Sequence, residues 1–416
     1  SSASTCSARS PTRCWGDELP DKAGSGLKTG VDTAAALRNA FSTEVGVEPL
    51  TDASRMGRRI HGVNLSLALT AAQVTALVAA LDEWQIVSFP NQDRNGMTVL
   101  DLERLANHFG APIPHPSNLD DYLGGGSIKI KAVKDRPSTA VNAAFPDAIS
   151  CLPGADSPAV YLVTNLHGSG PDAIPAVGGG QHWHTDIEFE RVPLSTSMFL
   201  VQHSPSRRGE AGAWVHNPSR EPGFYHPASH QLLAERREVL PLNGETAYTD
   251  TAAAYEALPA DERSELDQVR VRRRLRTDDE GVLVPLVHVN PRTGRRSLHS
   301  PIWASRGKRV APASIDGCSP DEARRFFDRL EEHCLAAEFR YDHPHTPGDV
   351  TIWSNFSTLH VAPPTKRPVN DPADARLLYR ISCKGPISES LPRADADDGV
   401  DANINPPYRS ALSQPE

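Results

Sequence analysis

Apolar residues recur at the spacing of an amphipathic helix in three segments of the chain. The first begins at Thr70, a residue type that caps helix N-termini, and runs to Trp84. The second covers about Thr98–His108, and the third begins at Ser319 with Pro320 at its first helical position. The pattern therefore predicts two helices near the start of the chain and one near its end.

Short apolar or alternating runs, bounded by Gly and Pro, predict strands before, between and after these helices. They are Arg59–Leu65, Ile86–Phe89, Ser127–Val133, Val160–Thr164, Asp349–Trp353 and Leu377–Cys383. The chain also contains 36 Pro and 29 Gly without a collagen-like period, which fits strands joined by long connections. Strands with helices before and after them, in no regular βαβ alternation, favour a mainly β sandwich or barrel with flanking helices.

Composition divides the chain into three parts. Residues 1–55 are polar and rich in small side chains, which predicts an N-terminal extension. Residues 56–386 carry the predicted elements and are expected to form one domain, with loop-rich insertions at about 119–180 and 204–243. Residues 387–416 are polar again and predict a loose C-terminal tail.

The charge balance excludes some classes of partner. Lys and Arg number 43 against 52 Asp and Glu, a net charge of −9, whereas nucleic-acid binders usually carry a basic surface. The longest wholly apolar run is Ala76–Leu81, far shorter than the roughly 18 residues of a membrane span. We therefore expect a small-molecule substrate, with neither nucleic acid nor a membrane as a partner.

The six cysteines are scattered without a C-x-x-C pair, which favours reduced or buried thiols over a disulfide scaffold. No strong targeting signal is visible, so a cytoplasmic location is expected. The numbered chain begins at Ser1 without Met, which leaves a removed targeting leader open. The sequence also leaves a homo-oligomer open.

The segment His182-Trp183-His184-Thr185-Asp186 carries the first candidate chemistry. Residues two apart in a strand share a face, so His184 and Asp186 can present a nitrogen and a carboxylate oxygen to one point. These are two of the three ligands in the facial triad that holds Fe(II). One His-x-Asp pair is no more than chance predicts from this composition, so it needs support elsewhere in the chain.

A second cluster near the end of the chain supplies that support. Residues 347–355 predict a turn that leads into a strand, and His360 follows. Arg376 and Arg380 are four residues apart, so on a strand both face one way, about 13 Å from each other. Arginines that face into a β core need anionic partners, and the planar guanidinium suits a carboxylate or sulfonate. A third histidine and an inward arginine complete what a metal site with a dicarboxylate cosubstrate requires.

Several motifs in order along the chain carry a resemblance to a known family. They are Gly62–Leu65, Ile86–Phe89, Phe109–Gly110, His115–Pro116, Trp183–Asp186, Gly244–Tyr248, Ala254–Leu258, Gly348–Asn355, His360, Arg376 and Arg380. Over about residues 57–386, with two interruptions, the sequence resembles the TauD/TfdA family of Fe(II)- and 2-oxoglutarate-dependent dioxygenases.

The resemblance implies a double-stranded β-helix (jelly roll) core, with Fe(II) as cofactor and 2-oxoglutarate and O2 as cosubstrates. It implies His184, Asp186 and His360 as the catalytic iron ligands. It further implies that Arg376 binds the distal carboxylate of 2-oxoglutarate, assisted by the hydroxyl of Thr246.

The substrate is less well defined by the resemblance. His115 and Arg380 match positions that contact the substrate's sulfonate in the family's type member, taurine dioxygenase. Asn118 and Gly180 stand where that member has a substrate-contacting Tyr and Asn, and the two insertions would reshape the lid. We therefore expect hydroxylation of a C–H bond in a small anionic substrate, a sulfonate or carboxylate other than taurine, with succinate and CO2 released.

Other interpretations stay open at this point. The same scaffold could serve a hydroxylase or desaturase of a larger secondary metabolite. A cupin-like zinc protein or zinc hydrolase could use His182, His184 and His360, although zinc does not explain the trailing arginines. A non-catalytic anion-binding module is a third possibility. Arg380 could also form an internal salt bridge, and Thr246 could be only a turn hydroxyl.

Overall fold

The computed structural model describes residues 32–52, 55–94, 96–113, 159–166, 182–190, 194–205, 214–290, 292–305, 310–366 and 369–384. Its largest element is an eight-stranded sheet in the order β1-β2-β3-β13-β6-β15-β4, with β5 also paired to β15. The strands are β1 (Gly46–Pro49), β2 (Arg58–His61), β3 (Ile86–Phe89), β4 (Ala111–Pro112), β5 (Tyr161–Thr164), β6 (Thr196–His203), β13 (Val350–Ser354) and β15 (Leu377–Lys384). Apart from the parallel pair β2–β3, neighbouring strands in this sheet are antiparallel.

A smaller sheet faces the large one. It has the order β12-β7-β14, with β7 (Thr246–Asp250) in the middle, β12 (Arg340–His343) on one side and β14 (Thr358–Val361) on the other. Two further antiparallel pairs are β8 (Arg270–Arg273) with β9 (Val282–Pro285) and β10 (Val287–Val289) with β11 (Arg296–Leu298).

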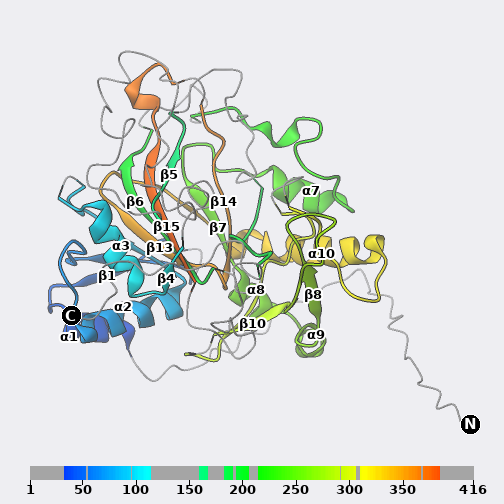
Figure 1. The fold of residues 1–416 in the computed structure, drawn as a ribbon, viewed down its shortest axis with the longest axis horizontal. Coiled ribbons are helices and arrows are strands. Elements are labelled where there is room, and N and C mark those ends of the chain that lie inside the picture. Colours follow the sequence, from blue (N-terminus) through cyan, green and yellow to red (C-terminus); the bar gives the residue numbers. More distant parts are fainter. Residues whose placement is uncertain are drawn as a thin grey trace, which may run out of the picture.

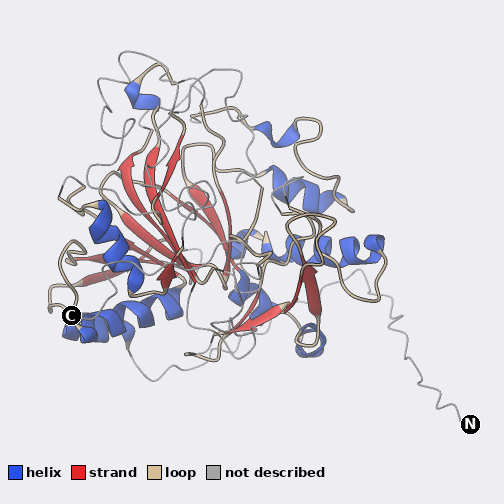
Figure 2. Cartoon of the chain, viewed as in Figure 1, coloured by secondary structure: helices blue, strands red, loops and turns tan. Residues whose placement is uncertain are grey.

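Helices flank the two sheets on opposite sides (Figures 1 and 2). Beside the large sheet lie α1 (Thr33–Ala40), α2 (Ala71–Trp84) and α3 (Val99–Asn107), with α2 in contact with β13 and α3 in contact with β15. Beside the small sheet lie α7 (Gln231–Glu238), α8 (Thr251–Ala257), α9 (Ala260–Leu266) and α10 (Pro320–Cys334). Short 3-10 turns cover Pro218–Arg220, Ala337–Phe339 and Pro372–Asp374.

Strand alternation explains how one sheet serves two apolar cores. In β6, Met198 and Leu200 pack into the core shared with the flanking helices, whereas Phe199 and Val201 point the other way. Phe199 and Val201 lie in a core that also contains Tyr248 of the small sheet. The two sheets therefore pack face to face around a shared interior, as in a jelly roll. The predicted mainly β fold with flanking helices is confirmed.

The predicted helices are present with close to their predicted bounds. Thr70, Thr98 and Ser319 each cap a helix and form a capping box with the residue three positions later. Of the predicted strands, the one over Arg59–Leu65 is shorter, because the chain turns at Gly62 with φ of 80°. The strand predicted over Ser127–Val133 lies outside the described residues.

Two elements lie inside the stretch 1–55, for which the sequence predicts a polar extension. Helix α1 buries Leu37, and β1 pairs with β2 from Gly46 to Pro49. Both belong to the large-sheet side of the fold, where Leu37 and Val45 join the main apolar core. Few apolar residues are enough here because Leu37 and Val45 are buried and others pack partly buried against the same core, which a composition average does not reveal. The predicted tail over 387–416 lies outside the described residues.

Helices α7 and α10 are joined by a buried charge network. Arg237 of α7 donates from Nε to Glu331 Oε1 at 2.7 Å and lies 3.5 Å from Asp328, with all three side chains more than nine-tenths buried. Asp328 in turn accepts the backbone N–H of Ser229 at 2.8 Å. No helix among the described residues is long and apolar enough to cross a membrane.

Arg237→Met is expected to lower the free energy of unfolding by about 3–5 kcal/mol, because it leaves Glu331 buried without its cation and Asp328 with only the more distant Arg324. Urea denaturation followed by circular dichroism measures this. The matched control is Arg220→Met, since Arg220 pairs with Glu238 but has a side chain that is 78% exposed. It should change the unfolding free energy by less than about 1 kcal/mol. An equal effect of the two substitutions would contradict the assignment.

Asp349 provides a pH-dependent contribution at the turn before β13. Its side chain is 1% exposed, and burial raises its pKa to about 6 despite the opposing effect of Arg59. The folded-state pKa is thus higher than that of the unfolded chain, so the fold favours the protonated carboxyl. Its stabilising contribution is complete at low pH and is lost as the pH rises through about 6.

Asp349→Asn removes this titration while it keeps the side chain's shape. Relative to the variant, the wild type should lose about 2 kcal/mol of unfolding free energy between pH 4 and pH 8. Urea denaturation of both proteins across this range measures the difference, in which other titrating groups cancel. A difference that does not vary with pH would show that Asp349 has an ordinary pKa.

Candidate metal centre

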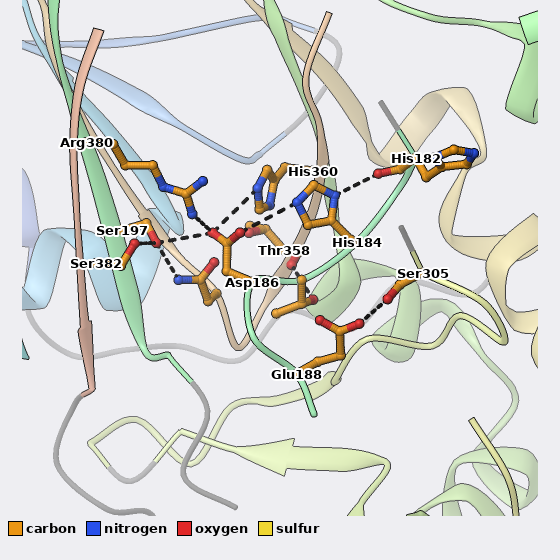
Figure 3. Close-up of polar contacts among 12 residues, drawn as sticks. His182, His184, Asp186, Glu188, Ser197, Ser305, Thr358, His360, Arg380 and Ser382 are labelled. Carbon is orange, nitrogen blue, oxygen red and sulfur yellow. Dashed lines mark hydrogen bonds and ion pairs between the residues drawn. The ribbon is translucent and has the colours of Figure 1, made fainter. Parts of the chain in front are cut away.

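Three predicted ligands from two distant segments meet between the sheets. The backbone N–H of His184 donates to the carbonyl of His360 at 3.0 Å, and the N–H of His360 donates back at 2.9 Å. The Nε2 atoms of His184 and His360 each lie 3.5 Å from an oxygen of Asp186. One nitrogen from each histidine and one carboxylate oxygen all lie within 4.8 Å of one another, in a buried position (Figure 3).

Local structure fixes the direction of each ligand. His184 donates from Nδ1 to the carbonyl of His182 at 2.7 Å, which leaves Nε2 facing Asp186. A second nitrogen held in this way sets the tautomer and ring orientation that a metal ligand needs. His360 lies on β14 directly opposite Tyr248 of β7, and both side chains face the space between the sheets. After Asp186 the chain turns sharply at Ile187, which has φ of 51°.

The Asp186 carboxylate is held in its ionised form. Burial raises its pKa, but the attraction of Arg380 and His360 outweighs burial and holds the pKa well below its usual range. Arg380 donates from its guanidinium to Oδ2, and Ser197 Oγ lies 3.3 Å from the same oxygen (Figure 3). Two imidazole nitrogens and one ionised carboxylate are the donor set of a non-haem Fe(II) site. The residues present therefore fit the predicted iron.

Arg376 directly precedes β15, the strand that carries Arg380, and it has a different environment. Its side chain is buried and donates from Nε to the carbonyl of Gly244 at 3.3 Å, and Nη2 lies 3.5 Å from Thr246 Oγ1. Among the described residues it forms no ion pair with a carboxylate. Burial lowers its pKa to about 10, so it is still protonated at neutral pH. Glu245 is the one described carboxylate that acts on it electrostatically, and it does so without an ion pair. A buried cation that lacks an ion pair among the described residues favours an anionic ligand.

Tyr248 is a residue of this interior that sequence reasoning missed. Its side chain is completely buried, and its hydroxyl has no hydrogen-bond partner among the described residues. It lies within electrostatic reach of Asp186, Arg376 and Arg380. The signal was available, because Tyr248 is two positions after Thr246 and a strand puts both on one face. An unpaired donor beside two arginines again favours an anion in this space.

The other predicted residues have distinct outcomes. His115, Asn118 and Gly180 lie outside the described residues. His182 does not join the three ligands, because its Nε2 is 2.5 Å from the carbonyl of Phe224 and its ring stacks on that of Phe224. In the part of the chain that the structure describes, the three ligands above are the one group of His, Cys, Asp and Glu placed to share a metal ion. The zinc site that includes His182 is therefore not formed.

Comparison with known proteins agrees with this geometry. The family described as "Taurine catabolism dioxygenase TauD, TfdA family" matches residues 46–382. The chain belongs to the TauD/TfdA family. The enzyme is thus an oxidoreductase, a 2-oxoglutarate-dependent dioxygenase of a family that uses Fe(II), 2-oxoglutarate and O2.

Individual relatives of this TauD/TfdA protein are distant. It is 24% identical to the alkylsulfatase of Acinetobacter baylyi over 336 residues, which cover 80% of this chain and 84% of the relative. It is 30% identical to the pentalenolactone F synthase of Streptomyces arenae over 164 residues, but the match covers 33% of this chain and about half, 51%, of the synthase. A taurine dioxygenase from Burkholderia xenovorans shares the fold, with a TM-score of 0.52 and 23% identity over 82% of this chain and 92% of the other.

Asp186→Ala is expected to weaken Fe(II) binding by more than about 100-fold, since loss of an outer-shell partner alone typically costs about 10–100-fold. Anaerobic metal titration with a competing chelator measures the affinity. Glu188→Gln is the matched control, because Glu188 is buried two residues away and pairs with Ser305 rather than with the three ligands (Figure 3). If both variants bound iron like the wild type, the metal centre would have to lie elsewhere.

Proposed function

We propose that His184, Asp186 and His360 hold the ferrous ion of this dioxygenase, and that Arg376 binds the distal carboxylate of 2-oxoglutarate. Two features together carry the proposal. One is the three-ligand cluster with its ionised Asp186 carboxylate, and the other is a buried arginine that has no ion pair among the described residues. A zinc hydrolase or a simple anion binder needs only one of these two features. The Thr246 hydroxyl, 3.5 Å from the Arg376 guanidinium, is placed to share the carboxylate.

The protein's own groups position the reactants. The bound ferrous ion with O2 supplies the oxidising chemistry: 2-oxoglutarate becomes succinate and CO2, and a substrate C–H bond gains the second oxygen atom as a hydroxyl. Arg376 neutralises the distal carboxylate of 2-oxoglutarate and orients the molecule, so that the 2-oxo acid group at the other end faces His184 and His360. The aromatic side chains of Phe199, Tyr248 and Trp353 surround this space and exclude water.

For the substrate we propose a small organic anion, a sulfonate, sulfate ester or carboxylate. Arg376 is buried just before β15, and Arg380 on β15 packs over the rings of Phe199 and Trp353, which suits an anion with an apolar body. The names of the relatives that align over most of this chain support it: an alkylsulfatase and a sulfate ester dioxygenase of Pseudomonas putida, 25% identical over 361 residues. Substrate contact by Arg380 and His115, a cytoplasmic location and a homo-oligomeric state stay predictions.

A larger secondary metabolite is the second candidate, since the pentalenolactone F synthase is 30% identical over part of this chain. Product analysis separates the two. Hydroxylation next to a heteroatom of a sulfonate or sulfate ester releases sulfite or sulfate. Hydroxylation of a larger metabolite leaves a product heavier by one oxygen atom, and desaturation leaves one lighter by two hydrogens.

The test of the proposal begins with anaerobic Fe(II) and 2-oxoglutarate. Their joint binding should produce a visible charge-transfer absorption band, and a panel of alkyl sulfonates, alkyl sulfates and aryloxy carboxylates should then be screened for succinate release in air. A protein that binds iron but gives neither the band nor succinate would refute the 2-oxoglutarate assignment.

Arg376→Leu should weaken 2-oxoglutarate binding by about 100-fold, because a charge-assisted bond to a carboxylate contributes roughly 1.5–3 kcal/mol. The charge-transfer titration measures the dissociation constant. Arg272→Leu serves as the control, since Arg272 forms an exposed pair with Asp316 far from the cluster. Unaltered 2-oxoglutarate affinity in Arg376→Leu would remove this arginine from the cosubstrate site.

A further inference from the structure

A buried histidine that the motifs do not explain lies beside the proposed cosubstrate site. His345 follows β12 and is 7% exposed, and its Nε2 lies 2.8 Å from Thr246 Oγ1 on the neighbouring strand. The same Oγ1 lies 3.5 Å from Nη2 of Arg376. The Thr246 hydroxyl therefore lies between the imidazole of His345 and the guanidinium of Arg376. His345 also lines a pocket of about 380 Å³ together with His203 and Glu245.

The proton on the Thr246 hydroxyl can be assigned by counting donors. A hydroxyl has one proton to donate and two lone pairs that accept, and a guanidinium can only donate. If His345 Nε2 carries a proton, it and Arg376 fill both lone pairs, and the Thr246 proton is left to donate elsewhere. If His345 Nε2 lacks a proton, the Thr246 proton is consumed by His345 and cannot reach an anion.

The surroundings of His345 favour the first arrangement. Burial and the nearby charge of Arg376 hold the pKa of His345 well below its usual range, so the ring is neutral and carries a single proton. Its Nδ1 is buried without a partner among the described residues. A proton on Nδ1 would leave a buried N–H without an acceptor, whereas a proton on Nε2 leaves only an unfilled lone pair, and buried orphan donors are the rarer of the two.

We propose that His345 is a positioning residue for the cosubstrate: it donates from Nε2 to Thr246, and this turns the Thr246 hydroxyl proton toward the distal carboxylate of bound 2-oxoglutarate. The inference rests on the function proposed above and adds the His345 side chain to the proposed 2-oxoglutarate site. The contacts of His345 among the described residues are with Thr246, Phe199 and His343 and include none of the metal ligands, so its effect is expected at one end of the cosubstrate.

Another histidine of the same segment shows what a purely structural role looks like. His343, two residues earlier, has both ring nitrogens occupied, with Tyr341 Oη at 3.0 Å and Thr351 Oγ1 at 2.9 Å. Neither partner reaches Arg376 or Thr246 by a hydrogen bond among the described residues. His343 is therefore a control for the general effect of changing a buried histidine in this segment.

The test uses two amides of different reach. The amide nitrogen of His345→Gln can occupy the place of Nε2, whereas that of His345→Asn is too short. With Fe(II)-loaded protein under anaerobic conditions, the charge-transfer band gives affinities for 2-oxoglutarate and for 2-oxopentanoate, which has a methyl group in place of the distal carboxylate. His345→Asn should weaken 2-oxoglutarate binding by about tenfold and 2-oxopentanoate binding by less than about twofold. His345→Gln should stay within about threefold of the wild type for both.

Two further variants complete the design. In a Thr246→Val background, His345→Asn should have no additional effect on 2-oxoglutarate affinity, because the hydroxyl through which it acts is absent. His343→Asn should lower the melting temperature without changing the ratio of the two affinities. If His345→Asn does not fold, His345→Ala takes its place in the same comparisons, because alanine also lacks a donor at the position of Nε2.

The outcomes are distinct. An unaltered affinity in His345→Asn, an equal loss for both ligands, or full additivity with Thr246→Val would overturn the role of His345. A wild-type protein that binds iron but neither 2-oxo acid would instead refute the proposed function, whatever the variants do.

Discussion

The site depends on one short backbone contact between two distant segments. His184 and His360 exchange a reciprocal pair of N–H to carbonyl hydrogen bonds, which join the segment before β6 to strand β14 of the small sheet. This bridge fixes the separation of the two imidazoles and, with Asp186 two residues further on, brings three donor atoms to one point. Because the bonds are made by the backbone, the ligand geometry is part of the sheet structure and is not left to side-chain freedom.

The two arginines of the interior differ in their charge partners. At one end Arg380 pairs with Asp186, so two opposite charges balance within the protein. At the other end Arg376 has no carboxylate partner among the described residues and contacts only neutral oxygens of Gly244 and Thr246. An incoming anion meets at Arg376 a guanidinium that only the more distant Glu245 offsets, whereas at Arg380 it would have to share the guanidinium with Asp186. This asymmetry favours Arg376 over Arg380 as the residue that binds the carboxylate of 2-oxoglutarate.

The flanking layers support this interior without taking part in it. Ala247, Leu359 and Val361 on the outer face of the small sheet belong to one apolar cluster with residues of α8 and α10, while the alternate residues of the same strands face inward. The buried network of Arg237 with Glu331 joins α7 to α10 behind that layer. A change there is expected to act on stability and only indirectly on the ligands, because the rigid sheet lies between.

Local signals in the sequence determined much of this protein. Capping residues and apolar spacing are short-range, so the helices that begin after Thr70, Thr98 and Ser319 were predicted with close to their observed bounds. Strand alternation suggested His184 with Asp186 but could not select the pair without the later cluster, and in the structure His184 forms an isolated bridge with His360 while Asp186 lies in the turn that follows. The residue pattern near the end of the chain pointed to His360 and Arg376, and the resemblance to a family then gave them their roles beside the first pair.

Tertiary structure decided which of these residues meet and what each one contacts. His182 and Asp186 are each two residues from His184. The ring of His182 nevertheless stacks on Phe224 and contacts its carbonyl, so it does not join the cluster. Arg380 and Arg376 look equivalent in sequence, but within the described residues only Arg380 forms an ion pair with a carboxylate. The partners of His345 and Tyr248 also come from other strands, because contacts across a sheet depend on register and packing between segments far apart in the chain. Such contacts leave no trace in local spacing, so only the folded arrangement could assign them.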